Sequence, residues 1–141
     1  MPIKTFRGKM INNTIDTIPL HTINGSTGYR IIDFIVFPTT DAAIESTMKV
    51  YSIPQTTASN GIDFSDPTLL AAAYYSQHDD SHAYPEDLSV FFDNVTFNQD
   101  IYVTLRGHNY TADLNYMIKL EVVKLDLNEN TVATLKDIRN I

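Results

Sequence analysis

The stretch that decides the fold is LNYMIKLEVVKLDL, residues 114–127. From Leu114 to Val122 every second residue is apolar or aromatic, and a period of two is typical of a β-strand with one buried face. The apolar phase then slips by one, since Val123 and Leu125 continue on the opposite face. We therefore expect a β-bulge near Val122, or a strand that passes from one partner to another.

Several other segments also have the patterns of β-strands. Residues 101–108 alternate in the same way, and residues 46–53 alternate with Met48 and Val50 on one face, which predicts a half-buried strand. Residues 29–37 are almost continuously apolar, which predicts a central strand covered on both faces. Shorter or less regular strands are predicted at residues 14–23 and 88–92. In residues 69–77 Leu and Ala favour one or two helical turns and the paired tyrosines favour a strand, and we predict a strand because the neighbouring elements are strands.

The order of these segments indicates an all-β protein. Strand patterns follow one another without alternating helices, so we predict a single antiparallel β-sandwich over residues 1–141, jelly-roll-like in topology. Only residues 128–141 differ, because Val132, Leu135 and Ile138 recur at threes, the spacing of a helix with one apolar face. This short C-terminal helix or arm is expected to cover its own sheet or a neighbouring subunit.

Composition and charge exclude several classes of protein. The chain has no cysteine, so disulfides, thiolate metal sites and cysteine nucleophiles are excluded. It contains no apolar run long enough to span a membrane and no secretory signal pattern. Net charge is −7, and residues 41–100 hold ten acids against one base. Such a surface repels phosphate, so we expect neither nucleic acid nor a membrane as a partner.

The stretch HDDSH, residues 78–82, contains the candidates for a metal site. Histidines four residues apart converge on one ion only when the stretch is helical, whereas Ser81, the adjacent aspartates and Pro85 favour a loop. Calcium-loop spacing is also missing. We interpret the stretch as a solvated loop and predict no metal or other cofactor; the residues in question are His78, Asp79, Asp80 and His82.

Catalytic patterns are equally weak. No nucleophile elbow or phosphate-binding glycine loop is present, and the many carboxylates lie in segments where solvation is their usual role. We therefore predict no catalytic residues and no enzymatic activity. An alternative is a tail-associated module that binds host surface polysaccharide by stacking sugar rings on exposed aromatic side chains. Its candidate platform would come from Tyr51, Tyr74, Tyr75, Tyr84, Tyr102 and Tyr110.

Three segments carry a resemblance to a known group of proteins. They are STGYRIIDFIVFP (26–38), VFFDNVTFNQDIYVTLRG (90–107) and the ending LNYMIKLEVVKLDLNENTVATLKDIRNI (114–141). In these segments the chain resembles small virion structural proteins of marine tailed bacteriophages. The resemblance implies a component of the phage particle, assembled in the host cytoplasm and placed on the head or the tail.

The resemblance does not fix the place in the particle, which could be the head surface, the tail or the adsorption apparatus. Our first interpretation is a capsid decoration or accessory protein that binds the assembled head lattice. Its partners would be the major capsid protein or other virion subunits. A homo-oligomer is expected, and we predict a trimer because lattice sites on heads have local threefold symmetry. The candidate docking segments are a basic N-terminal arm, residues 1–13, and the C-terminal segment, residues 128–141. Their partner-binding residues would be Lys4, Phe6, Arg7, Lys9, Leu135, Ile138 and Ile141.

Overall fold

The structure is a computed structural model that describes residues 2–22, 25–40, 42–77, 87–108 and 113–125. Within these residues the chain forms strands only, and no helix. The strands are β1 (Ile3–Met10), β2 (Thr14–Ile18), β3 (Thr27–Pro38), β4 (Ile44–Tyr51), β5 (Leu69–Gln77), β6 (Asp87–Phe92), β7 (Thr96–Phe97), β8 (Ile101–Gly107) and β9 (Leu114–Lys124). The predicted strands within 14–23, 69–77 and 88–92 are therefore confirmed as β2, β5 and β6.

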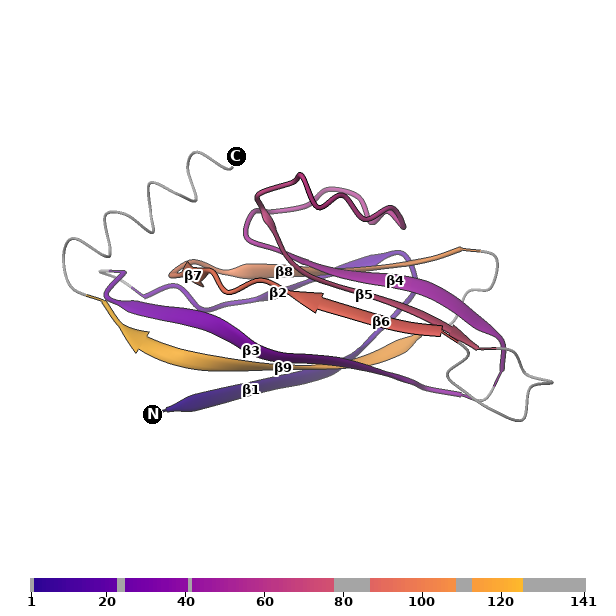
Figure 1. Cartoon of the computed structure of the whole chain (residues 1–141), viewed down its shortest axis with the longest axis horizontal. Helices are drawn as coiled ribbons and strands as arrows, with labels where there is room; N and C mark the ends of the chain where they lie inside the picture. Colours follow the sequence, from indigo (N-terminus) through magenta and orange to yellow (C-terminus); the bar gives the residue numbers. More distant parts are fainter. Residues whose placement is uncertain (1, 23–24, 41, 78–86, 109–112, 126–141) are drawn as a thin grey trace.

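The strands are arranged in two antiparallel sheets that face each other (Figure 1). One sheet has four strands in the order β1-β9-β3-β7, and the other has five in the order β2-β8-β4-β5-β6. A single cluster of buried apolar side chains from both sheets fills the space between them. The predicted all-β antiparallel sandwich is confirmed, because alternating side chains on each strand supply the two inner faces.

Strand β9 organises the four-stranded sheet. It pairs with β1 on one side and with β3 on the other, and its inner residues Leu114, Ile118 and Leu120 are at most 1% exposed. The predicted bulge near Val122, or change of partner strand there, is wrong in both forms, since β9 pairs with β3 from Leu114 to Lys124 and stays in register past Val122. The irregularity lies on the partner strand, between Ile31 and Asp33.

The near-continuous apolar run in β3 has one buried face and one open face. Ile31 and Phe34 both point into the core, although they are three residues apart, because the bulge inserts one extra residue between them. The other face carries Ile35 and Phe37, and Phe37 is 59% exposed. The prediction that this strand is covered on both faces is therefore wrong: apolar residues continue on a face that no described element covers.

Strand β4 shows the opposite error. Its outer face was predicted to meet solvent, yet Lys49 is only 2% exposed. The connection between β4 and β5, residues 52–68, lies over the outer face of the five-stranded sheet (Figure 1). The Lys49 ammonium group donates hydrogen bonds to Ser59 Oγ at 2.8 Å and to the Gly61 carbonyl at 2.6 Å. The lysine thus ties this connection to the sheet.

The connection from β2 to β3 is held by Asp100, at the start of β8. Its Oδ1 accepts hydrogen bonds from the backbone N–H groups of Leu20 and His21, at 2.8 and 2.9 Å, and lies 2.6 Å from Nδ1 of His21. Burial raises the pKa of Asp100, but the hydrogen bonds from His21 and Leu20 outweigh it, so the pKa lies below its ordinary value. The charged carboxylate is the form that stabilises the fold.

We expect Asp100→Asn to lower the melting temperature most at neutral pH. A group whose folded-state pKa is depressed stabilises the protein above its unfolded-state pKa and loses that effect as pH falls through the folded value. The difference in melting temperature between the variant and the unmodified chain should therefore shrink as pH falls below about 3.8, the ordinary pKa of an Asp side chain. Thermal unfolding across this range measures it, with Asp16→Asn, at an exposed position, as control. A difference independent of pH would contradict the assignment.

Candidate functional site

The outer face of the four-stranded sheet brings basic and apolar side chains together. The registers of β1, β9 and β3 place Arg7 beside Met117, which in turn lies beside Ile35. The next row contains Lys9, Asn115 and Phe37. Side chains directly opposite each other on neighbouring strands lie about 5 Å apart at their Cβ atoms. Two cations on β1 therefore lie at one side of this face, and the apolar side chains Met117, Ile35 and Phe37 lie beside them on β9 and β3.

These rows line an open groove of about 570 Å³, which we call the outer groove. Its residues are Arg7, Gly8, Lys9, Ile35, Phe37, Asn115, Tyr116 and Met117. Arg7 and Lys9 are exposed, and neither makes an ion pair with any residue that the structure describes. The ion pair between Arg30 and Glu121 on the same sheet, at 2.6 Å, lies outside the groove. The groove thus combines uncompensated positive charge with accessible apolar surface.

The four N-terminal docking candidates divide between the two faces of β1. Arg7 and Lys9 belong to the outer groove, whereas Phe6 packs against the core. Lys4 shares the inner face of the strand with Phe6, and its ammonium group lies 5.8 Å from the centre of the Tyr29 ring. Residues 3–10 form a strand paired with β9 along its whole length, so the segment predicted as an arm is part of the sheet.

The remaining predicted residues cannot be placed. The C-terminal candidates Leu135, Ile138 and Ile141 lie outside the described residues, as does the predicted helix over 128–141. The same is true of the weak metal candidates His78, Asp79, Asp80 and His82. Among the residues that are described, no group of three or more His, Asp or Glu side chains could hold a metal ion.

The tyrosines of the sugar-binding alternative are partly described. Tyr75 lies in the core at 2% exposure. Tyr51 and Tyr102 face each other across β4 and β8 and are half-buried, with the Lys49 ammonium 5.5 Å from the centre of the Tyr51 ring. Tyr74 donates a hydrogen bond to Glu45 and packs edge-on against His108. Tyr84 and Tyr110 are outside the described residues. Of the four described tyrosines, Tyr75 is buried and Tyr51, Tyr74 and Tyr102 are half-buried.

Sequence reasoning missed the apolar half of the outer groove. Ile35, Phe37 and Met117 were assigned only to strands, and two of the three were expected to be buried on both sides. A signal was present in residues 29–37, where apolar residues occupy both phases of a strand. Such a strand is either covered on both faces or carries an interaction surface on one of them, and only the three-dimensional packing distinguishes these cases.

Comparison with known proteins finds no matching family model and no significant match among curated proteins. In the described part of the chain, no helix has the length and apolar character that crossing a membrane requires. Any functional conclusion therefore depends on the geometry of the chain itself and on the resemblance described above.

Proposed function

We propose that the chain is a non-enzymatic structural subunit of a virion. In this proposal it is a capsid decoration or accessory protein that binds the assembled head lattice through the outer groove. The observation that carries the proposal is the pair Arg7 and Lys9, unpaired among the described residues, beside the exposed Phe37. The partner would be the major capsid protein or another virion subunit that presents an acidic segment with apolar side chains.

The charge distribution supports a docking role for this face. The chain carries a net charge of −7, so its other surfaces repel an acidic partner while the groove attracts one. Electrostatic complementarity of this kind sets orientation and association rate, whereas burial of apolar residues supplies most of the affinity. In our proposal Arg7 and Lys9 orient the subunit, and Ile35, Phe37 and Met117 lose contact with water on docking.

The strand order also supports the proposal. With β6 left out, the two sheets become β1-β9-β3-β7 and β2-β8-β4-β5, in which the first strand neighbours the last and the second neighbours the second-last. This supports the jelly-roll assignment, an architecture that viral capsid proteins commonly use. Fold alone does not determine function, so the outer groove remains the principal argument.

The proposed mechanism is stabilisation by mass action. A subunit that binds only the assembled lattice favours assembly by an amount that grows with its concentration relative to its dissociation constant. No covalent step and no cofactor is needed. The C-terminal segment 128–141 remains a second predicted docking element.

Quantitative mass spectrometry of virions that carry the gene for this chain tests the proposal. Copies on the same scale as the major capsid protein are expected for a lattice-bound subunit. A handful of copies per particle would instead place the chain in the tail and favour the polysaccharide-binding alternative. Absence from the particle would overturn both assignments.

Charge reversal in the groove should weaken docking. We expect Lys9→Glu to reduce co-sedimentation of the purified protein with virions stripped of it, by about tenfold in affinity at low salt. The matched control is Lys124→Glu, the same substitution at an exposed position at the far end of the same sheet. Equal binding by the two variants would mean that the outer groove is not the docking surface.

A further inference from the structure

Apolar side chains are exposed mainly around one strand, β6. Large hydrophobic residues are exposed at eight described positions, of which three lie in this strand and three line clefts beside it. Leu88, Val90 and Phe92 belong to β6 and are 38–44% exposed. Phe37 lines a cleft beside its inner face, and Ile62 and Phe64 line a second cleft beside its outer face. Contiguous apolar surface of this kind marks an interaction site.

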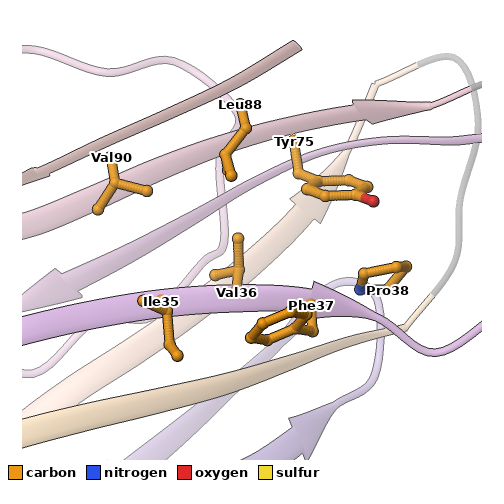
Figure 2. Close-up of a pocket in the computed structure, with 7 residues that line it drawn as sticks. All are labelled: Ile35, Val36, Phe37, Pro38, Tyr75, Leu88 and Val90. Atoms are coloured by element: carbon orange, nitrogen blue, oxygen red, sulfur yellow. The ribbon is translucent and has the colours of Figure 1, made fainter. Parts of the chain in front are cut away.

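The inner face of β6 is only partly covered by the other sheet, where β3 is the strand in contact with it. In the other sheet β7 pairs with β3 only at Tyr29 and Arg30, so no described strand follows β3 along that edge from Ile31 to Pro38. The resulting cleft has a volume of about 290 Å³. Figure 2 shows Val36 of β3 pointing toward Leu88 and Val90 of β6, with space between the two strands.

The free edge of β6 is also unprotected. Natural edge strands carry charges, proline or bulges that discourage pairing with another chain. Here β1 carries Lys4, Arg7 and Lys9, β2 carries Asp16, and the β3 edge has a bulge and ends at Pro38. In β6 the one charged residue is Asp87 at its first position, and the run Leu88–Phe92 that follows has no charge, proline or bulge. Among the described edges of more than two residues, β6 therefore has the longest run without a protecting feature.

We propose that β6 is the self-association surface of this protein, and that it pairs antiparallel with β6 of a second copy around a twofold axis. Each copy has a net charge of −7, which opposes close approach of two copies over most of their surface. The run Leu88–Phe92 itself carries no charge, so a second copy can add there, and antiparallel strand pairing satisfies the edge backbone groups of both copies.

The neighbouring acids restrict the register of this contact. Residues directly opposite each other must lie on the same face of the joined sheet. A pairing centred on Val90 would place Asp87 of one copy opposite Asp93 of the other, and like charges there are unfavourable. Centring on Ser89 or on Phe91 avoids this clash. With Phe91 at the centre, the pair of Phe91 rings extends the existing contact with Phe64, 4.8 Å between ring centres.

A twofold pair differs from the trimer predicted from lattice symmetry. A closed ring of three requires two different surfaces to meet, so that β6 of one copy would add to another edge of the next. The remaining edges carry charge, a bulge or proline, as described above, and these features oppose such pairing. The same unprotected edge in both copies therefore favours the twofold arrangement.

Sedimentation of the full chain tests this inference, with Ser89→Glu as the variant. Ser89 is exposed on the outer face of β6. In the register centred on Ser89 the new carboxylate would lie opposite its equivalent in the second copy, and in the register centred on Phe91 it would lie opposite Asp93 of the second copy. We expect the unmodified chain to form a reversible dimer that Ser89→Glu weakens by at least about tenfold. Thr17→Glu is the matched control, since Thr17 is exposed on the same face of β2, the opposite edge of the same sheet.

Cysteine cross-linking provides a second measurement that does not depend on weakening the fold. Because the chain has no cysteine, Ser89→Cys or Phe91→Cys should give a disulfide-linked dimer when that residue lies at the axis, and Thr17→Cys should give none. A monomer at all concentrations, a trimer that both glutamate variants leave intact, or the absence of cross-linking at both positions would overturn the inference. The measurements use the isolated chain, so they are independent of the virion proposal.

Discussion

Replacing Phe34 by alanine should lower the free energy of unfolding by roughly 3–5 kcal/mol. Phe34 is 1% exposed and ranks among the largest fully buried side chains. It pairs in register with Ile118 of β9, which is also fully buried. Truncation removes its transfer free energy and leaves a cavity in a core where rigid strands on both sides limit collapse.

Phe37→Ala is the matched control for this prediction. It is the same substitution three residues later in the same strand, at a position that is 59% exposed, and should change the free energy by no more than about 0.5 kcal/mol. Urea denaturation followed by circular dichroism gives both values, provided that the slope with denaturant is unchanged. Repeating the denaturation at several protein concentrations shows whether self-association contributes to the measured free energy of unfolding. Similar losses for the two variants would mean that the bulge in β3 does not direct Phe34 inward.

The pair Phe34 and Phe37 also shows where sequence reasoning about this fold succeeds and fails. Alternation identified β4, β8 and β9 because a half-buried strand has a period of two. In residues 29–37 apolar residues occupy both phases, and the pattern then does not say which phase is inside. The bulge between Ile31 and Asp33 changes the phase within the strand. Its position depends on pairing with β9, a contact that no local pattern encodes.

Tertiary contacts likewise explain the other errors. Lys49 lies on the opposite face of β4 from Met48 and Val50, as the alternation predicts. Residues 52–68 nevertheless fold back over that face of the sheet, and composition cannot predict where a long connection lies. Residues 1–13 were predicted as a docking arm because they are basic, whereas residues 3–10 form strand β1. Its pairing with β9 contributes backbone hydrogen bonds, which do not depend on side-chain pattern.

The candidate site, like the fold, could be predicted from the sequence only in part. Clustering of positive charge at the N-terminus identified Arg7 and Lys9 from composition alone. It could not separate them from Lys4 and Phe6, because only a paired strand assigns neighbours to opposite faces. The apolar half of the groove and the open edge of β6 arise from strands far apart in the sequence. They become visible only when the two sheets are assembled.

Lys49→Met should release the connection over residues 52–68 while leaving most of the sandwich folded. Methionine keeps an unbranched side chain, one atom shorter than that of lysine, but removes the hydrogen bonds to Ser59 and Gly61. Hydrogen bonds from a charged donor contribute roughly 1.5–3 kcal/mol each when their partners stay buried. Removing the ammonium also relieves the free-energy cost of its desolvation, which opposes this loss. Two short hydrogen bonds and the Tyr51 ring favour retention of the charge.

Limited proteolysis measures the release directly. Chymotrypsin cleavage after Phe64, in the middle of the connection, should accelerate by about tenfold in Lys49→Met, because cleavage follows the population of the opened form. Ser59→Ala should give a smaller acceleration, since it removes one acceptor and keeps the cation. Lys9→Met, the same substitution at an exposed position, should leave the rate unchanged. If Lys49→Met instead slows cleavage and raises the melting temperature, desolvation outweighs the hydrogen bonds and the lysine does not hold the connection in place.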